Sequence, residues 1–449
     1  MVAAKYTLLT VLLMLMVAPS LQSELEIVRS KPLNGAYTFA ASPVFSLESW
    51  MNGSFQDQYQ RHTEDSAGFK PDWVRLHNQL DHSIFSVPNP STVIRGKRGN
   101  YFTHEYITAS LGYDHLNRGL IDQRVMKLRR LQQFLRDEKG IFLLVIVAPD
   151  KVLFYPEDIP DRFTRRKPGI SGRDYLVKAC AGDGINLIDF NPWFRQMKDT
   201  SRWLLFPATG VHWSVYGSVL AADSAIRYLE KHLGRPMPDL CIDRIEMAEK
   251  PRQFDDDVNE TMNLVWDVDH PPLAYPVFHF DTNRITDAMQ SSGIKTQNPG
   301  KQLPRQGDNA PSMANQTHPP VNQTHFPADQ SQFPTDQSEF PVDKTRLPAD
   351  QKQSPGSKVK ALFIGDSFYW AWYDLGIIGR VFDKMEFWYY DREVYPEKFT
   401  QQKFTADVDL RESVERQDVI VLLQVGGGWG NPGVGFIDRA YAAYFSGNK

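Results

Sequence analysis

The chain has 449 residues, of which 41% are hydrophobic and 12% aromatic, so it has ample material for a large hydrophobic core. Its formal net charge of −4 leaves no basic footprint, which argues against nucleic acid as a partner. Its histidines and two cysteines show no metal-ligand spacing, so we expect neither a metal site nor a cofactor.

Residues 1–23 resemble a targeting element. Lys5 supplies a positive start, and the apolar run over residues 6–18 leads to small residues typical of a cleavage site. This run is shorter than the ~20 residues that a membrane span needs, which favours a cleaved signal peptide and a periplasmic protein; an uncleaved membrane anchor is the alternative. In that oxidising compartment Cys180 and Cys241 either form a disulfide or stay as two buried free thiols.

Helices and apolar strands alternate through the first half of the chain. Apolar residues recur at helical spacing over 125–135, Gly140 ends that helix, and the continuous apolar run 141–147 follows as a strand. A helix over 174–181 and a strand over 185–189 repeat the pattern. A helix that leads into a fully apolar strand is typical of a parallel sheet, so we predict an α/β fold.

A repeat divides this fold into two parts. Between Ala314 and Pro355 a seven-residue unit occurs six times, each time with a proline. A proline inside a helix costs ~3 kcal/mol, which excludes a coiled coil and favours a disordered or polyproline-like insertion. We therefore predict one α/β domain made of residues 24–284 and 358–449, interrupted by an insertion over 285–357.

A serine follows the first strand after the insertion. The apolar run 361–364 ends at Gly365, Asp366 and Ser367, and further strands are predicted over 385–390 and 418–423. In open α/β sheets, ligands bind at the carboxyl ends of the strands, which would place Ser367 at the mouth of a site. The alternative is that Ser367 only caps the next helix.

His212 provides a candidate base for this serine. It lies in the loop Thr209–Gly217, just before an amphipathic helix. A lone histidine at such a place is usually structural. However, a serine hydroxyl becomes a nucleophile only when a positioned base takes its proton, so the two motifs together favour a Ser367–His212 pair.

Five segments support a resemblance to a known family. In chain order they are Trp50–Phe55, Val93–Phe102, Val147–Glu157, His212–Gly217 and Gly365–Phe368. They resemble the SGNH hydrolase-like superfamily and, more narrowly, its AlgX/AlgJ-type polysaccharide O-acetyltransferases. The histidine segment precedes the serine segment, which is the circularly permuted order of that branch. The resemblance covers roughly residues 45–235 and 358–445.

The resemblance implies a three-layer fold with a parallel sheet between helices, and a site built around Ser367 and His212. Ser367 would attack an acyl donor, and His212 would act as general base and then as acid. The Ser367 amide and Asn431 would hold the oxyanion, although Asn431 also fits a plain Gly-rich turn. Further residues expected to bind the oxyanion or the substrate are Gly365, Asp366, Tyr369, Trp213, Lys151 and Arg392.

One position departs from the family pattern. The family motif carries an aspartate two residues before the histidine, where this chain has Gly210. The acid could come from Asp366 or Glu157, a backbone carbonyl could orient His212 instead, or the site could be catalytically weak.

The resemblance further implies acetyl transfer to an exported, alginate-like polysaccharide, with acetyl groups supplied by a membrane-bound acyl-transfer protein. An acetylesterase would use the same residues with water as acceptor. A non-catalytic polysaccharide-binding or assembly protein is the second alternative, favoured by Gly210.

Overall fold

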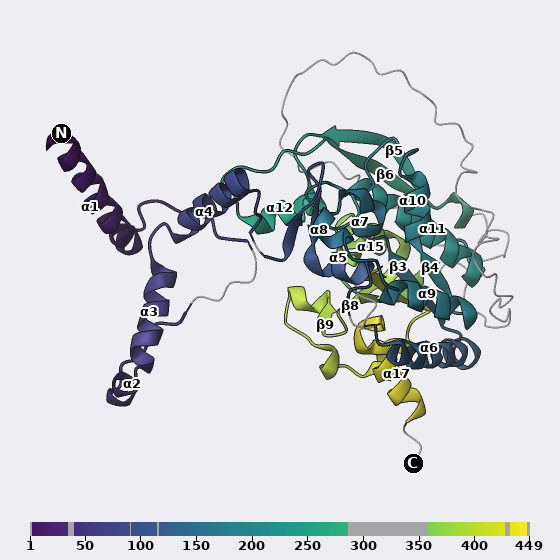
Figure 1. The fold of residues 1–449 in the computed structure, drawn as a ribbon. Helices are drawn as coiled ribbons and strands as arrows, with labels where there is room; N and C mark the ends of the chain where they lie inside the picture. The colour runs from purple at the N-terminus through teal and green to yellow at the C-terminus, as the bar shows by residue number, and fades with distance from the viewer. Residues whose placement is uncertain are drawn as a thin grey trace.

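A computed structural model describes residues 2–34, 40–89, 91–114, 116–285, 358–426 and 432–446 (Figure 1). The predicted repeat insertion, apart from residue 285, lies outside these residues. So does Asn431.

A six-stranded sheet forms the centre of the domain, in the order β4-β3-β10-β7-β8-β9. All neighbours are parallel except the edge pair β8 and β9. In chain order the strands are β3 (Phe142–Ala148), β4 (Leu187–Asp189), β7 (Val359–Gly365), β8 (Phe382–Tyr389), β9 (Glu393–Tyr395) and β10 (Val419–Val425). The strands thus come from both sides of the predicted insertion, and β10 of the second part pairs with β3 of the first.

Helices cover both faces of this sheet, which confirms the predicted α/β class. Successive side chains of a strand point to opposite faces, so β3 sends Leu144 and Ile146 into one core and Leu143 and Val145 into the other. The first core is completed by α11 (Val215–Leu233), α14 (Tyr369–Asp374) and α15 (Ile377–Val381). The second is completed by α6 (Arg118–Lys139), α9 (Gly172–Gly182) and α17 (Phe436–Phe445).

Shorter elements surround the sheet. Two antiparallel pairs stand apart from it: β1 (Val93–Arg95) with β2 (Tyr101–Thr103), and β5 (Asp239–Ala248) with β6 (Leu273–Asp281). Between β5 and β6 the chain leaves the hairpin to form a 3-10 turn (Gln253–Asp256) and α12 (Asp257–Met262). The remaining helices of the domain are α5 (His104–Ser110), α7 (Lys151–Phe154), α8 (Asp161–Thr164), α10 (Phe190–Met197) and α16 (Leu410–Glu415).

The N-terminal helices extend away from the domain as an arm (Figure 1). They are α1 (Val2–Leu25), α2 (Leu47–Met51), α3 (Ser54–Ser66) and α4 (Lys70–Phe85). The part Ala4–Leu25 of α1 is long and apolar enough to cross a membrane, by length and composition.

The two cysteines do not form the disulfide that was one of the two predicted arrangements. Both are free thiols: Cys180 is buried in α9, and Cys241 is half-buried on β5. Cys180 packs in the core between α9 and the main sheet, whereas Cys241 lies on the separate β5–β6 hairpin.

Candidate active site

Ser367 stands at the carboxyl end of β7, in a turn that only glycine allows. A Cβ atom on Gly365 would collide with the carbonyl oxygen of Leu423 on β10, so the two strands approach too closely for any other residue. Asp366 then fixes the turn to β10: its carboxylate accepts the Val425 N–H at 2.7 Å and the Phe368 N–H at 3.1 Å. Burial raises the pKa of Asp366 to about 6, against these hydrogen bonds.

His212 joins Ser367 to an aspartate. Its Nε2 lies 2.7 Å from Ser367 Oγ, and its Nδ1 lies 2.7 Å from Asp257 Oδ2. An ionised carboxylate only accepts hydrogen bonds, so Asp257 places the imidazole proton on Nδ1 and leaves Nε2 as the acceptor for the serine hydroxyl. Oγ, Nε2, Nδ1 and the carboxylate thus form one continuous line of hydrogen bonds, the arrangement that activates a serine for nucleophilic attack.

Asp257 was not among the predicted partners of His212. Of the two proposed acids, Asp366 is held by backbone amides, and Glu157 accepts hydrogen bonds from Arg98 and Lys198, both at 2.7 Å. The acid instead enters from the excursion between β5 and β6. The signal in the sequence is the run Asp255–Asp257, but a run of carboxylates normally marks a solvated surface.

Gly210, which replaces the aspartate of the family motif, lies directly beside the carboxylate of Asp257. A Cβ atom on Gly210 would lie 2.8 Å from Asp257 Oδ1, closer than Cβ atoms approach other atoms in proteins. The same oxygen accepts the Val211 N–H at 3.0 Å. The carboxylate of Asp257 therefore occupies space that a side chain at position 210 would need. The absence of a side chain on Gly210 makes room for this carboxylate.

The segment that carries Asp257 also binds the backbone of the loop around His212, residues 207–215, which we call the histidine loop. The Val258 and Asn259 amides donate to the Thr209 carbonyl at 3.0 and 3.2 Å, and the Asp255 carboxylate accepts the Val215 N–H at 3.1 Å. Burial raises the pKa of Asp255 to about 7. These contacts fix the loop on both sides of His212, so the imidazole and its acid are positioned by the same segment.

Lys151 holds the loop by hydrogen bonds to its backbone carbonyls. The prediction that Lys151 binds the substrate is therefore wrong. Its side chain is buried, and its ammonium donates to the carbonyls of Pro207, Ala208 and Gly210 at 2.6, 2.8 and 2.7 Å. An ammonium has three protons, so every donor is used by the loop. Burial lowers the pKa of Lys151 to about 7, while the charges of Asp257 and Asp158 oppose the change.

The protonation of His212 reflects two opposing effects. Burial lowers the pKa of the imidazole, but the charge of Asp257 and its hydrogen bond, together with the charges of Asp366 and Asp255, raise it above the ordinary value of 6.5. An imidazolium is thus stabilised at the place where a proton would arrive from Ser367.

Tyr390 is a neighbour of Ser367 that the sequence analysis did not select. Its N–H donates to the Gly365 carbonyl at 2.8 Å, and its phenol lies near enough to the Ser367 side chain for the serine to lower the pKa of the phenol, against the larger effect of burial, which raises it. Tyr390 and Asp391 both have left-handed backbones, with φ of 51° and 52°. Non-glycine residues rarely adopt this conformation, and here it turns the chain at the end of β8 so that a 43% exposed phenol borders the serine.

Of three other predicted binding residues, two are fully buried and one is exposed. Trp213 is fully buried and stacks on Trp372 with ring centroids 5.4 Å apart. Tyr369 is also fully buried, stacked on Phe387 at 3.8 Å. Both predictions of substrate contact are wrong, because these rings belong to the core beneath the site. Arg392 is exposed in the turn between β8 and β9.

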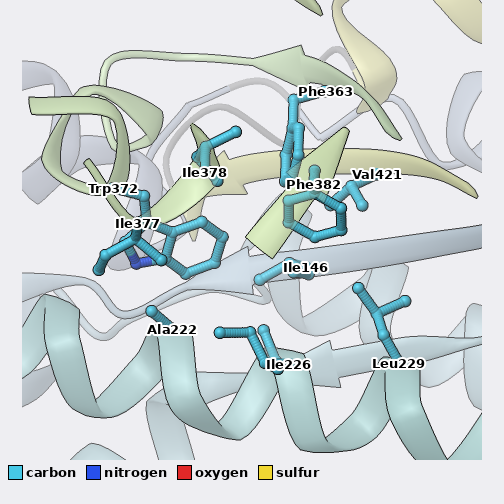
Figure 2. A pocket seen from close by; sticks show the side chains of 11 residues that line it. Ile146, Ala222, Ile226, Leu229, Phe363, Trp372, Ile377, Ile378, Phe382 and Val421 are labelled. Carbon is cyan, nitrogen blue, oxygen red and sulfur yellow. The ribbon is translucent and has the colours of Figure 1, made fainter. Parts of the chain in front are cut away.

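An apolar cavity lies elsewhere in the domain. Figure 2 shows it between α11 and the sheet, lined by side chains such as Ile146, Ile226, Phe363 and Val421. It offers no charged side chain for chemistry. No group of three or more His, Cys, Asp or Glu side chains within the described ranges is arranged to hold a metal ion.

One family model matches part of the chain that forms the site. Residues 93–276 match the family model of the SGNH hydrolase-like domain of acetyltransferase AlgX. His212 and Asp257 lie inside the matched range, and Ser367 lies outside it. A comparison with curated proteins gives no match.

Several solved structures are similar at low identity. The O-acetyltransferase domain of Pseudomonas putida AlgJ is 12% identical, with 76% of this chain and 92% of that chain covered and a TM-score of 0.41. Pseudomonas aeruginosa AlgX is 12% identical, with 77% and 67% covered and a TM-score of 0.39. Bacillus cereus PatB1 with a sulfonyl adduct is 11% identical, with 72% and 94% covered and a TM-score of 0.38.

Proposed function

We propose that the chain is an O-acetyltransferase acting on an exported polysaccharide, since residues 93–276 match the family model of the SGNH hydrolase-like domain of acetyltransferase AlgX. The observation that carries the proposal is the line of hydrogen bonds from Ser367 through His212 to Asp257. A family of acetyltransferases and a serine activated for acyl transfer point to the same chemistry.

The first half of the reaction loads the serine. His212 Nε2 takes the proton of the Ser367 hydroxyl as Oγ attacks the acetyl carbonyl of the donor. The tetrahedral intermediate collapses when the imidazolium gives that proton to the leaving group, and an acetyl ester remains on Oγ. Asp257 stays ionised and stabilises the imidazolium throughout.

The second half transfers the acetyl group. His212 takes a proton from a sugar hydroxyl, whose oxygen attacks the acetyl carbonyl on Ser367. The imidazolium then returns the proton to Oγ, and the serine leaves as a free hydroxyl. In both halves we assign the oxyanion to the Ser367 amide and to Asn431, since each fixed donor of this kind contributes ~3 kcal/mol to transition-state stabilisation.

The proposal includes a location and two partners. We place the chain in the periplasm, with an exported polysaccharide as acceptor and a membrane-bound acyl-transfer protein as the source of acetyl groups. The apolar helix α1, long enough to cross a membrane, is compatible with export or anchoring. We further propose that residues 24–284 and 358–449 act as one catalytic unit.

A non-catalytic role has less support than the sequence suggested. That alternative depended on Gly210, which left His212 without an orienting acid. Asp257 accepts the Nδ1 proton of His212 from another segment, so the departure at position 210 no longer argues against catalysis.

Acetate release from a small activated acetyl ester tests the proposal. We expect turnover by the wild type and loss of about six orders of magnitude in Ser367→Ala and His212→Ala, because the serine and the histidine act as one unit. His279→Ala is the matched control, since His279 pairs with Asp243 at 2.8 Å on the exposed surface of β6. Equal rates in the wild type and Ser367→Ala would contradict the proposal.

A second assay separates transfer from hydrolysis. With an oligosaccharide present, a transferase should move acetyl groups from the activated ester to sugar hydroxyls faster than it releases acetate. Acetate release that is unchanged by any oligosaccharide would instead identify an acetylesterase with the same residues.

A further inference from the structure

The helix α4 is amphipathic, but it turns its polar side toward the protein. Asn78 donates to the Met262 carbonyl at 2.8 Å, and Gln79 accepts the Val265 and Trp266 amides at 3.1 and 3.0 Å. His82 Nε2 lies 2.7 Å from the Tyr101 hydroxyl. These contacts attach α4 to α12, to the loop after it and to β2 through hydrogen bonds.

The opposite side of α4 is an exposed apolar stripe. Trp73, Leu76, Leu80 and Ile84 recur at the spacing of one helix face, and they are 47%, 42%, 48% and 65% exposed. In a helix that packs on a water-soluble domain, this is the face that is buried. A contiguous apolar surface of this kind marks an interaction site, so the stripe needs a partner outside the described chain.

The stripe begins next to the end of α1. Gly68 precedes α4, and a Cβ atom there would lie 2.6 Å from Gln22 Cβ and 2.7 Å from the Ser23 nitrogen, so α1 rests directly on this glycine. The Ser23 hydroxyl also donates to the Ser66 carbonyl at 2.8 Å. Figure 1 shows α1 and α4 meeting at one end of the arm, with the domain at the other end of α4.

We propose that α1 is retained as a membrane anchor and that α4 lies in the membrane–water interface, with its apolar stripe against lipid acyl chains. The anchor would place the start of α4 at the membrane surface. A tryptophan in the first turn and aliphatic residues behind it suit this interface, where indole rings are enriched. The domain would then be attached to the polar face of α4, on the side away from the membrane.

The charges on α4 indicate that the partner is the apolar part of the lipid and not an anionic headgroup. Lys70 pairs with Asp65 at 2.6 Å, and Arg75 donates to the Lys31 and Pro32 carbonyls, both at 2.7 Å. These cations already have partners within the arm. Membrane contact by α4 should therefore not require anionic lipid.

A fluorescent probe on the stripe tests this geometry. Leu80→Cys carries the environment-sensitive dye NBD in a Cys241→Ser background, and the full chain is reconstituted into phosphatidylcholine vesicles. Cys180 can stay, because it is fully buried and burial raises the pKa of its thiol to about 12. Met126→Cys is the matched control, an apolar residue of α6 that is 56% exposed on the catalytic domain.

We expect the Leu80 probe to emit at shorter wavelength than the Met126 probe, to resist quenching by aqueous iodide and to be quenched by spin-labelled lipid. Equal iodide quenching at the two positions would overturn the proposal. Protection without quenching by lipid, or protection that falls as protein is diluted in lipid, would overturn it in favour of a second copy. Isolation of a chain from cell membranes that is cleaved near residue 23 would also overturn it. None of these results depends on the acetyl-transfer reaction.

Discussion

The histidine loop and α4 both bury polar side chains, and they do so in different ways. Against the loop, the buried Lys151 of α7 and the partly buried Asp257 of α12 contact carbonyls, an amide and an imidazole, all of which are groups of the active site and its supporting loop. In α4, Asn78 and Gln79 meet backbone groups of the domain, while the apolar side of the helix stays exposed.

The comparison shows that residue polarity does not by itself decide which side is buried. A polar group can be buried at little cost when every donor and acceptor has a partner. At the histidine loop, Lys151 and Asp257 follow this rule, because each meets several hydrogen-bonding partners. In α4, the polar face binds the domain, so the apolar face stays available to a partner outside the domain.

After the Ser367 and His212 variants, the largest effect should come from Asp257→Asn. An amide at this place can donate to Nδ1 and favour the wrong imidazole tautomer, so we expect the turnover of an activated acetyl ester to fall by about 10⁴-fold, with little change in fold. Steady-state kinetics and urea unfolding measure the two effects. Asp243→Asn, which alters the exposed pair with His279, is the control and should leave turnover unchanged. A fall of less than tenfold in Asp257→Asn would exclude Asp257 as the orienting acid.

Gly210→Asp should inactivate the enzyme through crowding. Its Cβ atom would lie 2.8 Å from Asp257 Oδ1 and bring a second negative charge beside the first. We expect a loss on the order of 100-fold, the scale of an ångström-sized displacement of a catalytic group.

The double variant Gly210→Asp/Asp257→Gly sharpens this test. It removes the contact with Asp257 and leaves Pro207 Cγ at 2.8 Å and the Asp255 carbonyl oxygen at 3.1 Å from the new Cβ atom. Because it also supplies an aspartate at the position of the family motif, it should be more active than either single variant. A double variant no better than Asp257→Gly alone would show that the two positions are not exchangeable.

Lys151→Met should affect stability more than chemistry. The substitution removes the donor of the Pro207 and Gly210 carbonyls, while the Ala208 carbonyl keeps the Tyr101 N–H at 2.9 Å. We expect the free energy of unfolding to fall by about 2–4 kcal/mol, measured by urea denaturation. Lys97→Met is the control: its ion pair with Asp161 is exposed, so less than about 1 kcal/mol should be lost. Equal losses in the two variants would show that Lys151 does not support the loop.

The central sheet could be predicted because its strands carry the signal along their own length. Residues 141–147 form a continuous apolar run, and the structure has β3 over Phe142–Ala148. The placement of Ser367 after a strand follows from the same pattern. A strand buried on both faces needs no distant information to be recognised.

Contacts between distant segments could not be predicted. Asp257 meets His212 because the chain leaves the β5–β6 hairpin, and no local spacing describes that excursion. Likewise, a motif places Trp213 beside His212 without indicating that its ring points into the core. For α4, the sequence contains the apolar stripe, but only the contacts of Asn78 and Gln79 show that this stripe faces outward.

The smallest effect, and the one that reports most directly on the His212–Asp257 pair, is the pH dependence. His212 must be neutral to accept the serine proton, and its pKa is raised above 6.5, so kcat/KM should fall as the pH drops through that raised value. The effect on stability has the opposite sign: a raised pKa stabilises the fold fully below pH 6.5, and this contribution is lost as the pH rises through the folded-state value. Asp257→Asn removes the main cause of the raised pKa, so the acidic limb of the rate profile should move to lower pH and the stability difference should shrink. If the acidic limb stays in place in this variant, a group other than His212 controls the rate. The loss of the Asp257 charge must lower the pKa of His212, so a limb set by His212 has to move.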